Sequence, residues 1–327
     1  MTRASIAPSD AAAINAVLVA SRQAVDAICD RWSLSLVLAA LHGERLFSGL
    51  QSRTGMASGL LTARLGALTA AGVLERARSP TRSAGHEYRL TAAGEALSPV
   101  MLQMLRWDQN WAKTPEPASQ ALRHSACGRP LRLDLRCAAC GQPAGARDID
   151  LRVSATQLRR MPAKQRAHRR SSLSGHAGGL APQPLGPSLD MFGDKWGIEI
   201  LLCAFFRIRR FSDFRASTGV SANILTDRLA RFVAAGVMTP VKGGSRHAGY
   251  RLTEKGIDLY GAIVAIQDWA DAWLPHRYRS PVRLIHRDCG ATYHPTLSCA
   301  ACARPVDLGG VETLADARPL AMPGEPP

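Results

Sequence analysis

Residues 210–237 read RFSDFRASTGVSANILTDRLARFVAAGV, and this stretch decides the fold of the chain. Leu225, Leu229 and Phe232 recur at i, i+4 and i+7, which puts them on one face of a short helix. Ser221 stands where its side chain can cap the first turn of that helix. Glycines before and after the helix predict a turn and a C-cap. The stretch therefore predicts two short helices joined by a glycine turn.

The same pattern occurs earlier in the chain. Asp-Arg-Trp at 30–32 recurs as Asp-Lys-Trp at 194–196, an offset of 164 residues that holds as far as Val73 and then becomes 162. Tyr-Arg-Leu-Thr occurs at 88–91 and again at 250–253, and all six tryptophans fall into pairs. The chain is therefore a tandem duplication, which we call copy one and copy two. The single indel, at 73–88, marks an exposed loop or hairpin tip.

Each copy predicts the same series of elements. A helix around the first tryptophan is followed by a strand-like piece and then by a small helix begun by Ser48 or Ser212, because serine can cap the free amides of a first turn. A hairpin follows the second short helix, and Thr91 or Thr253 caps a long final helix. This order predicts a mainly α fold with small β-hairpins (α+β), built from two tandem winged helix-turn-helix domains. The expected ranges are helices at 11–28, 32–40 and 196–205, strand-like pieces at 46–47 and 210–211, and hairpins of 73–78 with 87–91 and of 237–242 with 250–253.

The composition changes sharply between the copies. From Leu151 to Leu180 there are seven basic residues and no acidic one, and three prolines follow. We expect a flexible tether there, either merely solvated or lying on DNA phosphates. The expected segments are an N-terminal extension (1–20), winged helix domain 1 (21–114), Cys/His knuckle 1 (121–146), a basic flexible linker (147–187), winged helix domain 2 (188–276), Cys/His knuckle 2 (283–308) and a disordered tail (309–327).

Composition limits the classes of function. The 41 lysines and arginines against 26 aspartates and glutamates in 327 residues give a formal net charge of +15, which favours double-stranded DNA as the partner. No apolar stretch is long enough to span a bilayer and no signal-peptide pattern opens the chain, so we expect a cytoplasmic protein with no membrane partner. No nucleophile-elbow, phosphate-loop, metalloprotease or dinucleotide pattern occurs, so we do not expect an enzyme.

The ordered motifs resemble those of HxlR-type bacterial transcriptional regulators. In copy two they are Asp-Lys-Trp (194–196), Arg-Phe-Ser-Asp-Phe (210–214), Gly-Val-Ser (219–221), Leu-Thr-Asp-Arg-Leu (225–229), Ala-Ala-Gly-Val (234–237) and Tyr-Arg-Leu-Thr (250–253). The resemblance covers both copies and implies a DNA-binding regulator, usually a homodimer that pairs through its terminal helices. A single family member has one such domain, whereas this chain has two. The redox-active cysteine that many members carry before the tryptophan is absent, since Leu18, Val19, Pro182 and Gln183 occupy that neighbourhood.

The second short helix of each copy is the expected recognition helix, and the hairpin is the wing. Asn223 can make a paired contact to adenine or merely support the helix start, and Arg228 can reach a phosphate or pair with an acidic neighbour such as Asp227. Copy one has Ala57-Ser58-Gly59 in place of Ser221-Ala222-Asn223, which predicts less specific reading. The residues expected to contact DNA are Ser58, Gly59, Thr62, Arg64, Arg76, Arg78 and Arg82 in copy one, and Ser221, Ala222, Asn223, Thr226, Arg228, Lys242 and Arg246 in copy two.

A Cys/His pattern follows each winged domain with unchanged spacing. Three thiolates and one imidazole suit a structural tetrahedral Zn²⁺ site, and Gly128 or Gly290 permits the tight turn. The alternative is a small hairpin with packed or occasionally oxidised cysteines. Cys29 and Cys203 lie in apolar helices, where a buried structural role is favoured over a reactive thiol. The two expected ligand sets are His124, Cys127, Cys137 and Cys140, and His286, Cys289, Cys299 and Cys302.

The leading hypothesis is a sequence-specific transcription regulator. Its two copies are expected to form a pseudo-dimer within one chain and to read an imperfect inverted repeat, although a homodimer stays open. The tryptophan pairs favour a core or dimer interface over a ligand pocket, and a small-molecule effector beside them stays possible. The alternative is a winged-helix scaffold for protein interaction with weak or non-specific nucleic-acid binding.

The basic linker yields the first prediction. If it lies on DNA, deleting Arg159 to Arg170 flattens the salt dependence of binding, because each lost phosphate contact removes about 0.9 from the log–log slope. Titration of a duplex at several salt concentrations measures that slope. An unchanged slope would identify the segment as a tether only.

Overall fold

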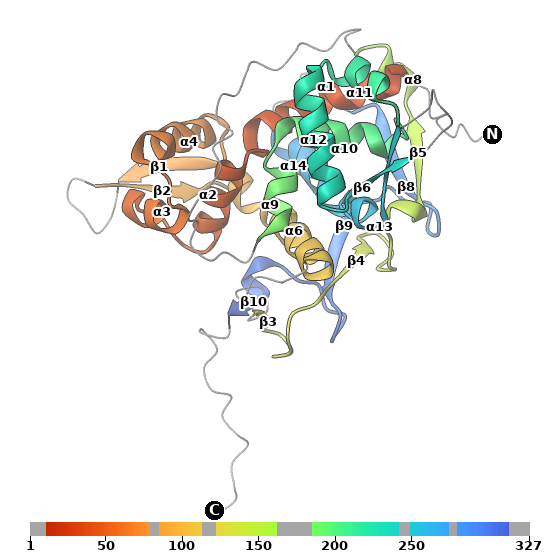
Figure 1. The fold of residues 1–327 in the computed structure, drawn as a ribbon. Helices are drawn as coiled ribbons and strands as arrows, with labels where there is room; N and C mark the ends of the chain where they lie inside the picture. Colours follow the sequence, from red (N-terminus) through yellow and green to blue (C-terminus); the bar gives the residue numbers. More distant parts are fainter. Residues whose placement is uncertain are drawn as a thin grey trace, which may run out of the picture.

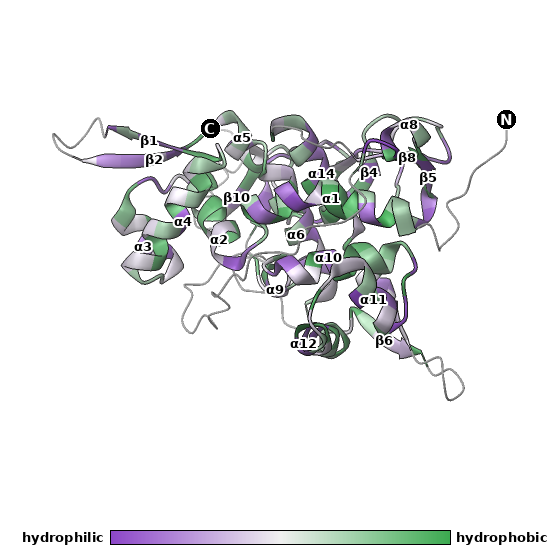
Figure 2. Ribbon diagram, turned by 90° about the horizontal axis from the view of Figure 1, so that it is seen from above, coloured by the Kyte–Doolittle hydropathy of each residue, from purple (hydrophilic) through white to green (hydrophobic). Residues whose placement is uncertain are grey.

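A computed structural model of the chain describes residues 11–78, 85–112, 122–161, 185–241, 249–274 and 280–313. Two winged-helix units flank a central group of helices, and their β-hairpins point to opposite ends of the molecule (Figures 1 and 2). Several predicted contact residues lie outside the described part of the chain. They are Arg82, Lys242 and Arg246 of the wings, and Lys164, Arg166, Arg169 and Arg170 of the linker.

The two winged units confirm the predicted fold. In copy one the unit comprises α2 (Arg31–Leu41), α3 (Phe47–Thr54), α4 (Ser58–Ala70), β1 (Leu74–Arg78) and β2 (His86–Leu90). In copy two it comprises α10 (Lys195–Phe205), α11 (Phe211–Thr218), α12 (Ala222–Ala234), β6 (Met238–Val241) and β7 (Gly249–Leu252). Each hairpin is an antiparallel pair, β1 with β2 and β6 with β7.

The helix ends follow the sequence at most positions. Ser221 accepts a hydrogen bond from Ile224 N at the start of α12. Thr91 and Thr253 do cap helices, but these are the short α5 (Ala92–Glu95) and α13 (Glu254–Ile257), and the predicted long final helix of each copy begins later without a side-chain cap. The predicted serine caps of α3 and α11 are wrong. These helices begin one residue earlier, at Phe47 and Phe211, with no side-chain cap. The preceding residues are extended because their backbone lies against the wing, as the 2.8 Å bond from Tyr88 N to Arg45 O illustrates.

The terminal helices join the two copies. α6 (Ser98–Trp111) and α14 (Tyr260–Trp273) pack on each other in the centre of the molecule. Trp107 Nε1 donates to Lys255 O at 2.9 Å, and Trp269 Nε1 donates to Ala93 O at 2.7 Å. The duplication maps each of these bonds onto the other. The copies are therefore related by a local two-fold axis, and the tryptophan pairs contribute to the interface between them.

The leading helices are exchanged across the same axis. α1 (Ala11–Ile28) packs on α10, α11 and α14 of copy two, whereas α9 (Pro187–Phe192) packs on α2 and α6 of copy one. By length and composition α1 could cross a membrane, but 56% of it is buried inside the protein. Its apolar surface is thus explained by packing between the copies.

The Cys/His segments form strands that pair between copies. The described strands there are β3 (Leu122–His124), β4 (Leu133–Cys137), β5 (Ile149–Val153), β8 (Val282–His286), β9 (Pro295–Cys299) and β10 (Val311–Thr313). β4 pairs with β9, β3 with β10 and β5 with β8, all antiparallel. Each turn keeps a local antiparallel bridge within its own copy, such as Arg123 with Pro130 and Ile285 with Thr292, and the longer ladders run between the copies.

Two predicted boundaries also change. β5 and the short helix α8 (Ala155–Leu158) lie inside the segment predicted as linker, and β10 lies inside the segment predicted as a disordered tail. The alternation of Ile149, Leu151 and Val153 is typical of a strand, and β5 is held by β8. The short 3-10 helices η1 (Ala146–Asp148) and η2 (Leu308–Gly310) precede β5 and β10.

Some polar contacts between the copies follow the local symmetry and some do not. Lys195 pairs with Asp26 at 2.9 Å, and Arg31 makes the equivalent pair with Asp190. The buried carboxylate of Asp108 has no symmetric counterpart, because the equivalent residue is Ala270. It accepts bonds from Gly186 N at 3.0 Å and Ser188 N at 2.8 Å, and a third from Ser188 Oγ at 2.5 Å. Burial raises the pKa of Asp108, while those hydrogen bonds lower it.

We expect Asp108→Asn to destabilise the chain. The amide keeps the shape of the side chain but loses charged acceptors for buried donors, which should cost about 1.5–3 kcal/mol of unfolding free energy. Asp190→Asn is the matched control, because Asp190 is 59% exposed and its loss should cost about 0–1 kcal/mol. Urea unfolding measures both. Equal effects would contradict the importance assigned to Asp108.

Candidate nucleic-acid interface and metal-binding clusters

The recognition helix of copy two has a buried face and an exposed face. Leu225, Leu229 and Phe232 are buried, as predicted, and hold α12 against its unit. Asn223 and Thr226 are exposed on the other face. The cap at Ser221 fixes the first turn, so the exposed side chains project from an ordered helix start.

The recognition helix of copy one begins differently. Ala57 at its N-cap makes no side-chain hydrogen bond. Gln51 takes over part of that role, since its Nε2 donates to Met56 O at 3.1 Å and to Ser58 Oγ at 2.9 Å. Thr62 is exposed, and open space surrounds the position that a side chain at Gly59 would occupy. The two copies therefore present different surfaces at equivalent places.

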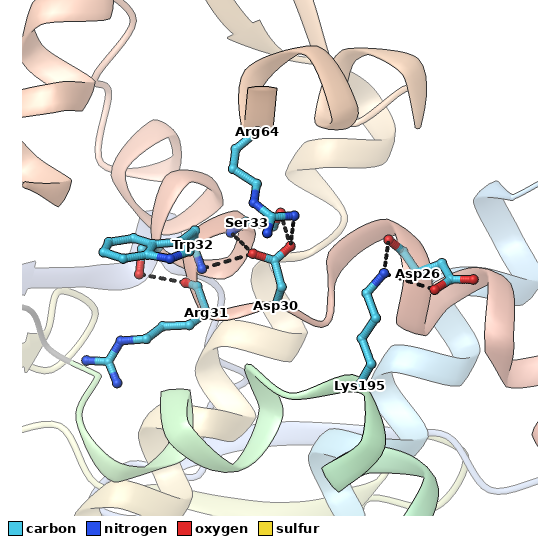
Figure 3. Close-up of polar contacts among 8 residues, drawn as sticks. Asp26, Asp30, Arg31, Trp32, Ser33, Arg64 and Lys195 are labelled. Carbon is cyan, nitrogen blue, oxygen red and sulfur yellow. Dashed lines mark hydrogen bonds and ion pairs between the residues drawn. The ribbon is translucent and has the colours of Figure 1, made fainter. Parts of the chain in front are cut away.

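Arg64 and Arg228 have partners within the protein. Arg64 pairs at 3.2 Å with Asp30, the aspartate that caps α2, and its side chain is 16% exposed (Figure 3). Arg228 pairs with Asp194, which caps α10, and also with Asp227. Each arginine thus ties the recognition helix to the start of the tryptophan-led helix. For Arg228 the pair with Asp227 is the alternative that the sequence left open, whereas for Arg64 only a DNA contact was expected. The sequence signal for these ion pairs was the Asp-x-Trp motif together with an arginine at the same position of the recognition helix in both copies.

The wings present further basic side chains. Arg76 and Arg78 are exposed along β1. In copy two β6 carries no lysine or arginine within Met238–Val241. The first strands of the two wings therefore differ in their basic side chains, as the recognition helices differ in their first turns.

Two clusters of cysteine and histidine could each hold a metal ion. In each cluster the candidate ligand atoms lie within 4.8 Å of one another. Cys127 Sγ lies 3.9 Å from Cys299 Sγ, and His124 Nδ1 lies 3.5 Å and 3.3 Å from Cys127 and Cys302. In the second cluster His286 Nδ1 lies 3.4 Å from Cys140 and 3.3 Å from Cys289. All eight cysteines are free.

The predicted grouping of ligands within each copy is wrong. The clusters are His124, Cys127, Cys299 and Cys302, and Cys137, Cys140, His286 and Cys289. Each combines the His-x2-Cys turn of one copy with the Cys-x2-Cys turn of the other. The physical reason is the ladder of β4 with β9, which carries Cys137 and Cys299 away from their own copy's histidine. The turns themselves form as predicted, since Gly128 and Gly290 adopt left-handed φ of 65° and 71°.

The remaining two cysteines are buried, as predicted. Cys29 and Cys203 are 0% exposed. Burial raises the pKa of Cys29 to about 12 and also raises the pKa of Cys203. Neither lies in a metal-binding cluster.

These features define a class of protein: a winged helix-turn-helix protein with two winged units, each with an exposed recognition helix. The model of the HxlR-like helix-turn-helix family matches residues 27–116 and 191–278, together more than half of the chain. The chain belongs to this family, and it contains the family domain twice.

Relatives of known name are similar over the length of one copy. An uncharacterized HTH-type transcriptional regulator of Mycobacterium tuberculosis (strain H37Rv) is 36% identical over 132 residues, which is 39% of this chain and 83% of the relative. YvaP of Bacillus subtilis, with the same description, is 33% identical over 90 residues, 27% of this chain and 83% of its own. A candidate transcription factor from Pseudomonas aeruginosa matches with TM-score 0.29 and 27% identity over 43% of this chain and 92% of its own.

Thiol reactivity tests the assignment of the two buried cysteines. We expect Cys29 and Cys203 to resist a thiol reagent such as iodoacetamide at pH 8, because burial and a raised pKa leave little thiolate. In the metal-free chain the exposed Cys289 should be labelled first. Mass spectrometry of peptides from the labelled protein identifies the sites, and denaturant should expose all eight. Rapid labelling of Cys29 in the folded chain would contradict the assignment.

Proposed function

We propose that the protein is a sequence-specific DNA-binding transcription regulator that inserts α4 and α12 into major grooves. The observation that carries this proposal is the presence of two family domains whose recognition helices each bury one face and expose the other. Names of the relatives as HTH-type transcriptional regulators support it. The net charge of +15 supports it further, since phosphate neutralisation supplies much of the affinity for DNA.

The proposed base-reading residues lie at the start of each helix, and all but the half-buried Ala222 are exposed. In copy two they are Ser221, Ala222, Asn223 and Thr226; in copy one they are Ser58, Gly59 and Thr62. Arg76, Arg78 and the basic wing residues Arg82, Lys242 and Arg246 are proposed to contact phosphates or the minor groove. Arg64 and Arg228 are assigned to holding the helices in place.

We further propose that the two copies act as a pseudo-dimer within one chain. Their polar interface favours pairing of copy one with copy two over pairing of like copies. Arg106, itself buried, pairs with Asp258, and the equivalents of these residues are Asp268 and Ala96. Two second copies would therefore oppose Asp268 to Asp258, and two first copies would leave Arg106 opposite an alanine. Unpaired or like charges at such an interface disfavour the wrong pairing.

For the two clusters we propose Zn²⁺. Five of the separations between ligand atoms, at 3.3–3.9 Å, are close to the tetrahedron edges of about 3.5–3.8 Å expected for Zn–S near 2.3 Å and Zn–N near 2.0 Å, and all lie within 4.8 Å. They far exceed the roughly 2.05 Å of a disulfide. A filled set of four protein ligands gives a structural site, so the proposal assigns no catalysis to it. A small-molecule effector stays a prediction from the tryptophan pairs.

The recognition helices can be tested by exchanging one residue. Asn223→Ala should weaken binding of a selected operator about 10- to 100-fold, because a paired contact to adenine is worth about 1–3 kcal/mol. Gly59→Asn supplies the copy-two residue to copy one, where a Cβ meets nothing within 4 Å. It should shift selected sites towards two similar half-sites.

Selection from a random duplex library, followed by titration at fixed salt, measures both effects. The wild-type chain should select an imperfect inverted repeat. The mass of the complex should correspond to one chain bound to one duplex. No preference among duplexes at low salt would contradict sequence-specific regulation and favour a protein-interaction scaffold. A complex that contains two chains would contradict the pseudo-dimer.

A further inference from the structure

We propose that the two metal ions are shared between the copies, so that metal occupancy fastens the pseudo-dimer and sets its competence to bind DNA. The proposal rests on the zinc assignment and the regulator function above. It adds what they leave open, namely what the shared ions control.

The ladders that bring the ligands together are weak without further support. Every sheet in the described residues has two strands, and three of the five join one copy to the other. A two-stranded antiparallel pair is marginally stable in water. Each cluster takes ligands from strands of two different ladders, His124 of β3 with Cys299 of β9 and His286 of β8 with Cys137 of β4. A metal ion bonded to all four ligands of a cluster would therefore fasten two ladders to each other, which is the role of structural zinc in small domains.

The ligand atoms are already oriented for an ion. The imidazoles of His124 and His286 are 2% and 0% exposed, and each directs Nδ1 at the cysteine thiols of its cluster. Cys137 and Cys299, at the ends of β4 and β9, are fully buried. Without an ion, the two buried ligands of each cluster would give up hydration for weak contacts only. An ion that bonds all four removes that cost.

β9, the strand that carries Cys299 of the first cluster, packs on α6 and α14, the two helices that join the winged units. Gln109 in the last turn of α6 donates to Leu131 O at 2.9 Å, beside the first cluster. His294, next to the start of β9, pairs with Asp268 of α14 at 2.9 Å. A change in the clusters therefore acts on the α6–α14 pair, and this pair determines the relative positions of α4 and α12.

The grouping of ligands can be tested with two double variants that remove the same number of cysteines. Cys127→Ser with Cys302→Ser removes two ligands of one cluster only, so one zinc per chain and one Cys3His cobalt spectrum should remain. Cys127→Ser with Cys137→Ser damages both clusters, so tight metal binding should be lost. Cys29→Ser is the control and should retain two zinc ions. The opposite result, with one zinc kept by Cys127→Ser/Cys137→Ser, would establish ligand sets within each copy and overturn the proposal.

The wild-type chain tests the same point if a variant fails to fold. Loaded with cadmium-113, it should give two metal resonances in heteronuclear NMR. One should correlate with the β protons of Cys127, Cys299 and Cys302, and the other with those of Cys137, Cys140 and Cys289. Correlation of Cys127 with Cys137 on one ion would overturn the proposal, as would fewer than one zinc per purified chain.

The control of DNA binding is tested by reversible metal removal. Chelation under reducing conditions should lower affinity for the selected operator at least tenfold, and one equivalent of Zn²⁺ per cluster should restore it. Unchanged affinity after complete removal would overturn the coupling. If the metal-loaded chain ignores every duplex, the regulator function fails, whereas the double variants and cadmium spectra still decide whether the ions are shared.

Discussion

β4 and β9 pair so that Leu135 stands opposite Leu297, two positions that the duplication makes equivalent. A residue can face its own repeat in an antiparallel ladder only if a two-fold axis passes between them. This single register therefore fixes how the copies are related. The outer ladders then occur as a matched pair, β3 with β10 and β5 with β8. The reciprocal tryptophan bonds and the exchanged leading helices follow the same axis.

Local features of the fold could be predicted because local residues determine them. The stripe of Leu225, Leu229 and Phe232 and the cap at Ser221 depend on neighbours within one helix turn or two. The start of α3 could not be predicted in the same way. Ser48 was as good a cap by residue type, but the wing backbone holds the preceding segment extended and starts the helix at Phe47.

The partner of each Cys/His strand was beyond the reach of the sequence. Spacing indicated which residues supply ligands, and that set of eight is the set found in the clusters. Since both copies carry the same spacing, the sequence cannot distinguish strand pairing within a copy from strand pairing between the copies. Buried contacts such as Asp108 with Ser188 gave no signal either, because an aspartate and a serine far apart in the chain match many partners.

Both halves lie on one polypeptide, and this has a consequence for how their association responds to dilution. Two separate subunits dissociate as their concentration falls, so a regulator present at few molecules per cell loses part of its paired form. A covalent connection replaces that concentration by a local one set by the length of the tether, roughly millimolar for a short flexible connection. A chain whose halves pair internally therefore stays paired at any abundance, and its gene can be expressed sparingly.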